Sequence, residues 1–321
     1  MSPAAGRLLT AAARGQAIAA FRRLPIERTT VLYESFAGNG MLCSPEAIYR
    51  GLRADPRYAH LRHVWVLDDP ARHPDVLAEL AGDDRVRVVT RRSAGYFRAL
   101  GTAGFLVNNA TFPAEFSKRP GQVYCNTWHG TPIKRMGFDV AGGAAAAGNI
   151  VRNFLHADVL LSASPFMTEQ LYAQAYRLRN LFPGQVLEAG YPRMDRQFVP
   201  REQARAQLAA RGVALGPGRV VLYAPTWRGT SFTDPRDDSA AVVARLEQLR
   251  ARLAGEWTVL VKVHQAVFDA ARGVPALRGA LVDNDLPTNQ VLAATDVLVA
   301  DYSSVVVDFL ALDRPIVLHA P

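Results

Sequence analysis

The sequence predicts an α/β protein whose two consecutive halves are each built around a parallel sheet. Short apolar runs of strand length alternate with longer stretches of helical patterning, which is typical of βαβ units. With 321 residues and 49% hydrophobic side chains, the chain is long enough to form two globular domains. We therefore expect a basic helix over residues 1–28 and Rossmann-like domains over residues 29–195 and 196–321.

In the first half, apolar runs predict strands at residues 30–34, 63–67, 85–89, 105–108, 123–127, 157–161 and 185–189. Ser44 is expected to cap a helix, with Pro45 in its first turn and Glu46 near its positive end. Another helix is expected over residues 167–176, and residues 133–136 can open a short one. The Gly/Ala segment 141–148 lacks a periodic face and predicts a mobile loop.

In the second half, strands are predicted at residues 219–224, 258–263, 280–282, 296–300 and 315–318. Helices are expected over residues 202–211, 240–253, 288–294 and 305–312. A polar loop is expected over residues 230–238.

The net charge of +8 and the pI of about 9.8 favour acidic partners such as nucleotides, phosphates or an anionic membrane surface. A nucleic acid is disfavoured because the arginines are scattered and no DNA- or RNA-binding motif is present. Cys43 and Cys125 lack ligand spacing, which argues against a disulfide framework and a zinc site and favours a reducing cytoplasm.

No apolar run approaches the roughly 20 residues that a membrane-spanning helix needs. Near the N-terminus, apolar residues can share one helical face beside arginines: Leu8, Leu9, Ala12, Ala19 and Phe21. Such a helix either lies on a membrane surface or packs on its own domain, and the sequence leaves both open.

Cationic and hydroxyl side chains gather where the expected strands end: His129, Lys134, Arg193, Arg228, His264, Tyr302, Ser303 and Ser304. Ligands of open parallel sheets bind at this edge. Ser303 and Ser304 can cradle a phosphate at a helix start or simply cap that helix. Asp308, one turn further, can reach a ribose hydroxyl or hold the turn, and we favour the structural role.

These strand ends suit transfer at a phosphorus centre. Positioning and charge neutralisation dominate such catalysis, and a neutral histidine can take the proton of an attacking hydroxyl. The sequence contains no Walker A motif and no GxSxG motif, and its acids form no metal-binding pattern.

Ordered motifs then give a resemblance to the CDP-glycerol glycerophosphotransferase family, which includes teichoic-acid primases and polymerases. The matching stretches are Tyr33-Glu34-Ser35-Phe36, Trp128-His129-Gly130-Thr131-Pro132-Ile133-Lys134, Gly190-Tyr191-Pro192-Arg193-Met194-Asp195, Tyr223-Ala224-Pro225-Thr226-Trp227-Arg228, and Asp301-Tyr302-Ser303-Ser304-Val305 with Asp308-Phe309, Leu312 and Arg314-Pro315. They occur in the family's order over residues 30–321.

The resemblance implies a GT-B-like fold, with an N-terminal acceptor domain and a C-terminal nucleotide-donor domain facing a cleft. It implies transfer of glycerol phosphate from CDP-glycerol to a hydroxyl of a lipid-linked acceptor (a glycerophosphate or glycan), with release of CMP. Neither a metal nor another cofactor is implied. The implied location is the cytoplasmic face of the cell membrane, with peripheral attachment.

The resemblance also implies roles for individual residues. His129 would be the general base, His264 and Arg228 would neutralise the donor phosphates, and Ser303 and Ser304 would hold the pyrophosphate. The full set of implied substrate-binding residues is Gly130, Thr131, Lys134, Arg193, Thr226, Arg228, Tyr302, Ser303, Ser304 and Asp308.

The chain departs from the family pattern in three places. Cys43-Ser44 replaces an Asp-Asn pair, Gln265 replaces a proline, and the chain stops shortly after Pro315, which predicts an incomplete C-terminal domain. Two alternatives therefore accompany the main hypothesis. One is a GT-B transferase that uses CDP-ribitol or a nucleotide sugar, and the other is a truncated, inactive relative that binds a membrane surface.

Overall fold

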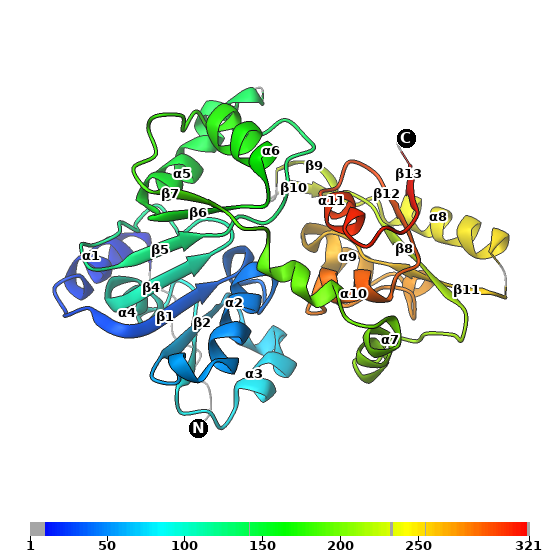
Figure 1. The fold of residues 1–321 in the computed structure, drawn as a ribbon, viewed down its shortest axis with the longest axis horizontal. Coiled ribbons are helices and arrows are strands. Elements are labelled where there is room, and N and C mark those ends of the chain that lie inside the picture. The colour runs from blue at the N-terminus through cyan, green and yellow to red at the C-terminus, as the bar shows by residue number, and fades with distance from the viewer. Residues whose placement is uncertain (1–9, 141, 232–233, 254, 320–321) are drawn as a thin grey trace. The chain divides into compact units, whose positions relative to one another are not determined.

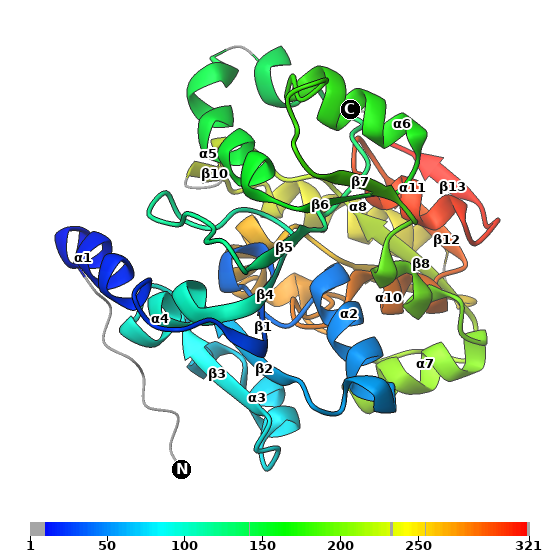
Figure 2. The same cartoon turned by 60° about the vertical axis from the view of Figure 1, so that its left-hand side comes forward.

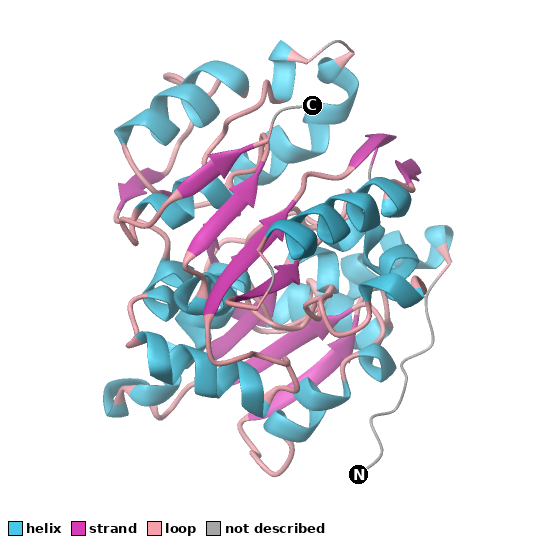
Figure 3. Cartoon of the chain, turned by 90° about the vertical axis from the view of Figure 1, so that its right-hand side faces the viewer, coloured by secondary structure: helices cyan, strands magenta, loops and turns pink. Residues whose placement is uncertain are grey.

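The computed structural model describes residues 10–140, 142–231, 234–253 and 255–319. The chain divides into two compact units, Met1–Arg193 and Met194–Pro321 (Figure 1). Each unit contains a parallel sheet with helices against it, and Figure 3 colours the strands and helices differently. The structure therefore has the α/β class that the alternating pattern predicts.

The first unit has a seven-stranded sheet in the order β3-β2-β1-β4-β5-β6-β7, and every neighbouring pair is parallel. Its strands are β1 Glu27–Glu34, β2 Arg62–Leu67, β3 Val86–Thr90, β4 Ala103–Asn108, β5 Val123–Asn126, β6 Val159–Ser162 and β7 Gln185–Glu188. All the strand predictions for this half are confirmed, with shifted ends.

Helices of the first unit cover both faces of this sheet. They are α1 Ala11–Phe21, α2 Cys43–Ala54, α3 Pro74–Leu80, α4 Ala94–Thr102, α5 Gly143–His156 and α6 Pro165–Met167, which continues as a π-helix over Thr168–Ala175. Val31 and Tyr33 of β1 pack with α2 and α3. Glu34 points to the other face, where its Oε2 accepts the Tyr96 hydroxyl of α4 at 2.8 Å. Apolar burial on both faces explains why β1 is a continuous apolar run.

Helix α1 packs against its own unit, beside α4 (Figure 2). Ile18 is buried, Arg14 forms an ion pair with Glu115 at 2.7 Å, and Gly101 of α4 lets the backbone of Phe21 approach closely. These contacts favour the packed-helix interpretation for the described part. Leu8 and Leu9 of the predicted apolar face lie outside the described residues.

The second unit has a four-stranded parallel sheet in the order β11-β8-β12-β13. Its strands are β8 Arg219–Ala224, β11 Trp257–Val261, β12 Val297–Ala300 and β13 Ile316–Leu318. Its helices are α7 Arg201–Ala210, α8 Ser239–Arg252, α9 Phe268–Arg272, α10 Thr288–Ala294 and α11 Val305–Leu310. Val220 and Leu222 pack with α7, α10 and α11, whereas Val221 and Tyr223 pack with α8 and α9, so β8 alternates between two cores.

Three local predictions for the first unit are wrong. Helix α2 begins at Cys43 with Leu42 as its cap residue, so Ser44 lies inside the first turn, where its buried hydroxyl has no hydrogen-bond partner among the described residues. Residues 133–136 form no helix, and the element that follows them is a 3₁₀ turn over Gly137–Asp139. Most of the predicted Gly/Ala loop belongs to α5, since alanine has the highest helix propensity and Phe154 anchors the helix in the core.

Two predictions for the second unit are also wrong. The expected polar loop contains a short antiparallel pair, β9 Arg228–Ser231 and β10 Asp234–Arg236. Residues 280–282 make only a single bridge between Leu281 and Val261, because the chain turns away after Val282. Among the described residues, no helix is long and apolar enough to cross a membrane.

Candidate active site

The first group of site residues lies where the order of the seven-stranded sheet reverses. From β1 the chain adds β2 and β3 on one side and then returns to add β4 on the other. Loops that leave two such strands diverge, and ligands bind in the space between them. Phe36 follows β1, Asn109 follows β4, and His129 follows the neighbouring β5.

His129 is held from three directions in this position. Its Nδ1 lies 2.6 Å from the carbonyl oxygen of Asn109. The Trp128 ring stacks on the imidazole at a centroid distance of 4.4 Å, and the Phe36 ring meets it edge-on at 5.5 Å. Three fixed contacts define both the position and the plane of the imidazole, which is the preorganisation that a catalytic base requires.

The hydrogen bond from His129 also determines which nitrogen carries the proton. A carbonyl oxygen can only accept, so Nδ1 must be the donor, and in the neutral ring the lone pair then lies on Nε2. Burial lowers the pKa of His129 to about 4, the Asn109 carbonyl partly opposes this shift, and the positive charge of Arg193 adds to it. At neutral pH His129 is therefore an uncharged base.

Strained backbone is concentrated around this histidine. Phe36, Ala37, Cys43 and Trp128 have φ values of 47°, 59°, 64° and 49°, in the left-handed region that non-glycine residues rarely adopt. All four lie in the segments that follow β1 and β5. Conformations of this kind cost about 1–3 kcal/mol each and occur preferentially at functional sites.

Arg193 is a buried cation at the same site. Its guanidinium lies 4.0 Å from the centre of the Tyr191 ring, and Nη1 donates to the Cys43 sulfur at 3.6 Å. Cys43 is the departure from the family pattern noted above, so in this chain a cysteine sulfur contacts the arginine. Gly130 and Thr131 are buried beside His129, whereas Lys134 is exposed on the following loop.

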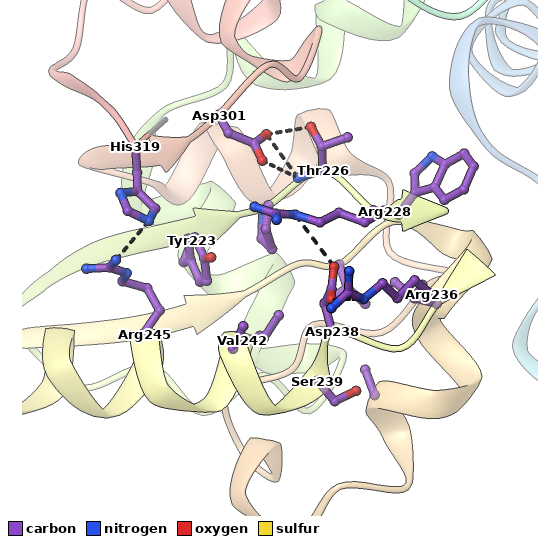
Figure 4. Close-up of a pocket in the computed structure, with 16 residues that line it drawn as sticks. Tyr223, Thr226, Arg228, Arg236, Asp238, Ser239, Val242, Arg245, Asp301 and His319 are labelled. Atoms are coloured by element: carbon purple, nitrogen blue, oxygen red, sulfur yellow. Dashed lines mark hydrogen bonds and ion pairs between the residues drawn. The ribbon is translucent and has the colours of Figure 1, made fainter. Parts of the chain in front are cut away.

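The second group of site residues surrounds a pocket of about 390 Å³ in the second unit (Figure 4). This volume lies within the range of small-molecule sites. Tyr223, Pro225, Trp227 and Val263 form part of its apolar wall. Its polar lining consists of Thr226, Arg228, Arg236, Asp238, Ser239, Arg245, Asp301 and His319. The excess of arginine over acid suits a phosphorylated ligand.

Thr226 and Asp301 join the strands at which this second sheet reverses its order. The Thr226 main-chain N–H and hydroxyl both donate to the Asp301 carboxylate, which links the ends of β8 and β12. Arg228 lies 3.6 Å from Asp238, and Arg236 lies 3.3 Å from it. Arg245 donates to His319 Nε2 at 2.8 Å. The sequence predicted Thr226 and Arg228 as site residues but missed Asp238, Arg245 and His319, which no motif marks.

His264, after β11, has the opposite proton arrangement to His129. Its Nδ1 accepts the main-chain N–H of Ala266 at 3.2 Å, so Nε2 carries the proton. The Trp227 ring lies 5.8 Å away. His264 therefore presents an N–H donor, and it does not line the pocket.

The remaining predicted residues lie after β12. Tyr302 is exposed, and Ser303 and Ser304 are half-buried before α11. Within the described part of the chain Ser304 forms no side-chain capping bond, and the Ser303 hydroxyl accepts the Val305 N–H at 3.4 Å. Asp308 is buried and accepts from Asn289 at 3.0 Å, in agreement with the structural role favoured above.

Within the residues that the structure describes, no group of three or more His, Cys, Asp or Glu side chains is arranged to hold a metal ion.

A comparison with protein-family models tests the family resemblance that the motifs suggest. The model for CDP-glycerol:poly(glycerophosphate) glycerophosphotransferases matches residues 16–321. The chain belongs to this family. The resemblance inferred from its motifs is thereby confirmed, and the glycerophosphotransferase family is one of transferase enzymes.

Curated relatives support the same family. The teichoic acid poly(glycerol phosphate) polymerase of Bacillus spizizenii W23 is 28% identical over 309 residues, which cover 93% of this chain and 75% of that protein. The polymerase of the same name from Bacillus subtilis strain 168 is 29% identical over 312 residues, 93% of this chain and 40% of that protein. The chain thus spans three quarters of one relative and less than half of the other.

A solved structure confirms the fold. An asparagine-for-histidine variant of the wall teichoic acid polymerase TagF, soaked with CDPG, superposes with a TM-score of 0.76. The identity is 25%, and the match covers 94% of this chain and 74% of that one. The glycerophosphotransferase family member described here therefore has the GT-B-like fold that the resemblance implied.

Proposed function

We propose that this chain transfers glycerol phosphate from CDP-glycerol to a hydroxyl of a lipid-linked acceptor in the synthesis of a teichoic-acid-type polymer. The observation that carries the proposal is His129, a neutral imidazole whose Nδ1–H is bound by a carbonyl and whose Nε2 holds a lone pair. The family membership and the polymerase relatives support the donor and the class of acceptor.

In the proposed reaction, Nε2 of His129 takes the proton from the acceptor hydroxyl. The hydroxyl oxygen attacks the phosphorus that carries glycerol, and the bond from this phosphorus to the bridging oxygen breaks. CMP leaves with that oxygen and its electron pair, and the imidazolium then loses its proton to solvent. A positioned general base of this kind contributes about 10²- to 10⁴-fold to the rate.

The donor is proposed to bind the second unit. His264, with its proton on Nε2, can donate to a phosphate oxygen, and the exposed Arg228 can neutralise phosphate charge. Thr226, Tyr302, Ser303 and Ser304 are proposed to hold the diphosphate. On the acceptor side, Gly130, Thr131, Lys134 and Arg193 are proposed to orient the glycerol phosphate end of the acceptor.

We also propose that the protein works at the cytoplasmic face of the membrane, bound through its positive charge. A lipid-linked acceptor has to be reached at a membrane surface, and a net charge of +8 attracts the protein to anionic lipids.

The test is CMP release from CDP-glycerol and from CDP-ribitol, with a lipid-linked acceptor analogue present. CDP-glycerol is expected to be the better donor. His129→Ala is expected to lower kcat by about 10²- to 10⁴-fold. His60→Ala, which replaces an exposed histidine of the same unit, serves as the matched control and should keep full turnover.

Each other outcome has a defined meaning. Preference for CDP-ribitol would replace the donor but keep the reaction class. No release from either donor would support the inactive, membrane-binding alternative. Full turnover by His129→Ala would remove the base assignment.

A further inference from the structure

Asn109 connects three parts of the histidine site although no motif marks it. It directly follows β4 and is completely buried. Its carbonyl oxygen accepts the Nδ1–H of His129 at 2.6 Å, and its side-chain Oδ1 accepts the main-chain N–H of Phe36 at 2.8 Å. One residue thus holds the base directly and also holds the loop that packs against the base.

The orientation of the Asn109 amide is determined by this second bond. The Phe36 N–H requires an acceptor, so Oδ1 must face it and Nδ2 must point away. Nδ2 is buried and has no hydrogen-bond partner in the described part of the chain. An unpaired buried donor costs about 1–3 kcal/mol. The hydrogen bond from Phe36 to Oδ1 is therefore accompanied by an unpaired Nδ2 group.

The bond to Phe36 stabilises a strained loop. Phe36 and Ala37 both have positive φ values, and the Phe36 ring contacts the edge of the His129 ring at 5.5 Å. Without the Oδ1 acceptor the Phe36 N–H would lose its hydrogen bond, so the loop would relax toward an ordinary conformation. That movement would take the Phe36 ring away from its contact with the imidazole.

We infer that Asn109 is a positioning residue for the reaction: its main chain fixes the tautomer of His129, and its carboxamide fixes the Phe36 loop that keeps the imidazole in plane. The inference rests on the proposed role of His129 as base. It concerns the side chain of Asn109, which a substitution can change, whereas the carbonyl remains in every variant.

Two variants and one control separate positioning from general stability. Asn109→Leu removes the acceptor but preserves bulk. Asn109→Asp keeps an acceptor oxygen at the same place and adds a negative charge beside His129. Gln122→Leu is the matched control, because Gln122 is also buried and its Oε1 accepts a main-chain N–H, that of Arg119 at 3.0 Å, at the amino end of β5.

The measurements are CMP-release kinetics across pH and imidazole ¹⁵N spectra, with the His129 signals assigned by their loss in His129→Ala. For Asn109→Leu we expect kcat to fall at least about tenfold and KM for CDP-glycerol to stay within about twofold. The Nδ1–H tautomer should be retained, because the carbonyl remains, but the His129 ¹⁵N signals should shift because the Phe36 ring no longer holds the imidazole plane. For Asn109→Asp we expect the Nδ1–H tautomer and much of the activity to be retained. The added carboxylate favours the imidazolium, so the acidic limb of kcat/KM should move to higher pH.

The inference is overturned if Asn109→Leu leaves the His129 ¹⁵N signals unshifted and loses no more activity than Gln122→Leu. If Asn109→Leu does not fold, Asn109→Asp decides, and an unshifted acidic limb with an unshifted His129 spectrum would then count against it. The spectra need no substrate, so they test Asn109 even if CDP-glycerol proves not to be the donor and the proposed function fails.

Discussion

At the scale of single residues, burial keeps two histidines of the first unit, His63 and His129, uncharged at neutral pH. His63 on β2 is 1% exposed, and its Nδ1 pairs with the Tyr33 hydroxyl at 3.0 Å. Burial lowers its pKa to about 4, and the positive charges of Arg53 and Arg85 add to the shift. His129, in the same unit, also has a pKa of about 4.

These shifts predict sensitivity to acid. The unfolded chain takes up a proton on each histidine near pH 6.5, whereas the folded chain does so only near pH 4. The contribution of these neutral histidines to the unfolding free energy is therefore fully present above pH 6.5 and is lost as the pH falls toward 4. Between pH 7 and pH 5, His63 alone should account for about 1–2 kcal/mol of the loss in unfolding free energy.

Urea unfolding at both pH values measures this effect. His63→Phe should reduce the difference between pH 7 and pH 5. Trp65→Phe alters a buried aromatic residue of the same strand that does not titrate, so it should lower the unfolding free energy equally at both pH values. Equal pH dependence in the wild type and in His63→Phe would contradict the assignment.

At the scale of elements, α5 shows how a small-residue segment becomes a helix. Seen alone, residues 141–148 carry no apolar period, but alanine favours helix and the following Phe154 is buried against Trp128 and Tyr172. Tertiary packing therefore decided a segment that the local pattern misassigned.

Two glycines of α5 give opposite predictions. A Cβ at Gly148 would meet nothing within 4 Å, so Gly148→Ala should raise the unfolding free energy by about 0.5–1 kcal/mol. A Cβ at Gly143 would lie 2.1 Å from the Gly137 carbonyl oxygen, so Gly143→Ala should destabilise by more than that. Thermal or urea unfolding checks both, and a gain from Gly143→Ala would show that the start of α5 is not packed as described.

At the scale of the whole molecule, net charge makes the membrane proposal testable. The chain carries 37 lysine and arginine residues against 29 acids. We expect binding to vesicles rich in phosphatidylglycerol but not to neutral phosphatidylcholine vesicles, with a steep loss as salt rises, because the Debye length falls from about 10 Å at 0.1 M to 3 Å at 1 M. Sedimentation with vesicles measures it, and salt-independent binding would indicate insertion of apolar groups instead.

The sequence by itself determined the α/β class, the strands of both sheets and the family. These follow from local periodicity and from motifs whose residues are contiguous, such as Trp128 to Lys134. It also singled out His129, because a histidine at a strand end is visible in the chain. It did not reveal Asn109. The role of this residue depends on its carbonyl, which bonds His129, and on its side-chain amide, which bonds Phe36, and these partners follow other strands of the sheet.

Only the tertiary structure decided the protonation of the two histidines. Nδ1 of His129 faces a carbonyl and Nδ1 of His264 faces an N–H, so the same residue type can act as a base in one unit and as a donor in the other. The structure likewise assigned Asp308 to a buried hydrogen bond and brought Arg245 and His319 into one pocket. Hydrogen-bond partners and burial are properties of three-dimensional neighbours, and residue spacing along the chain does not specify them.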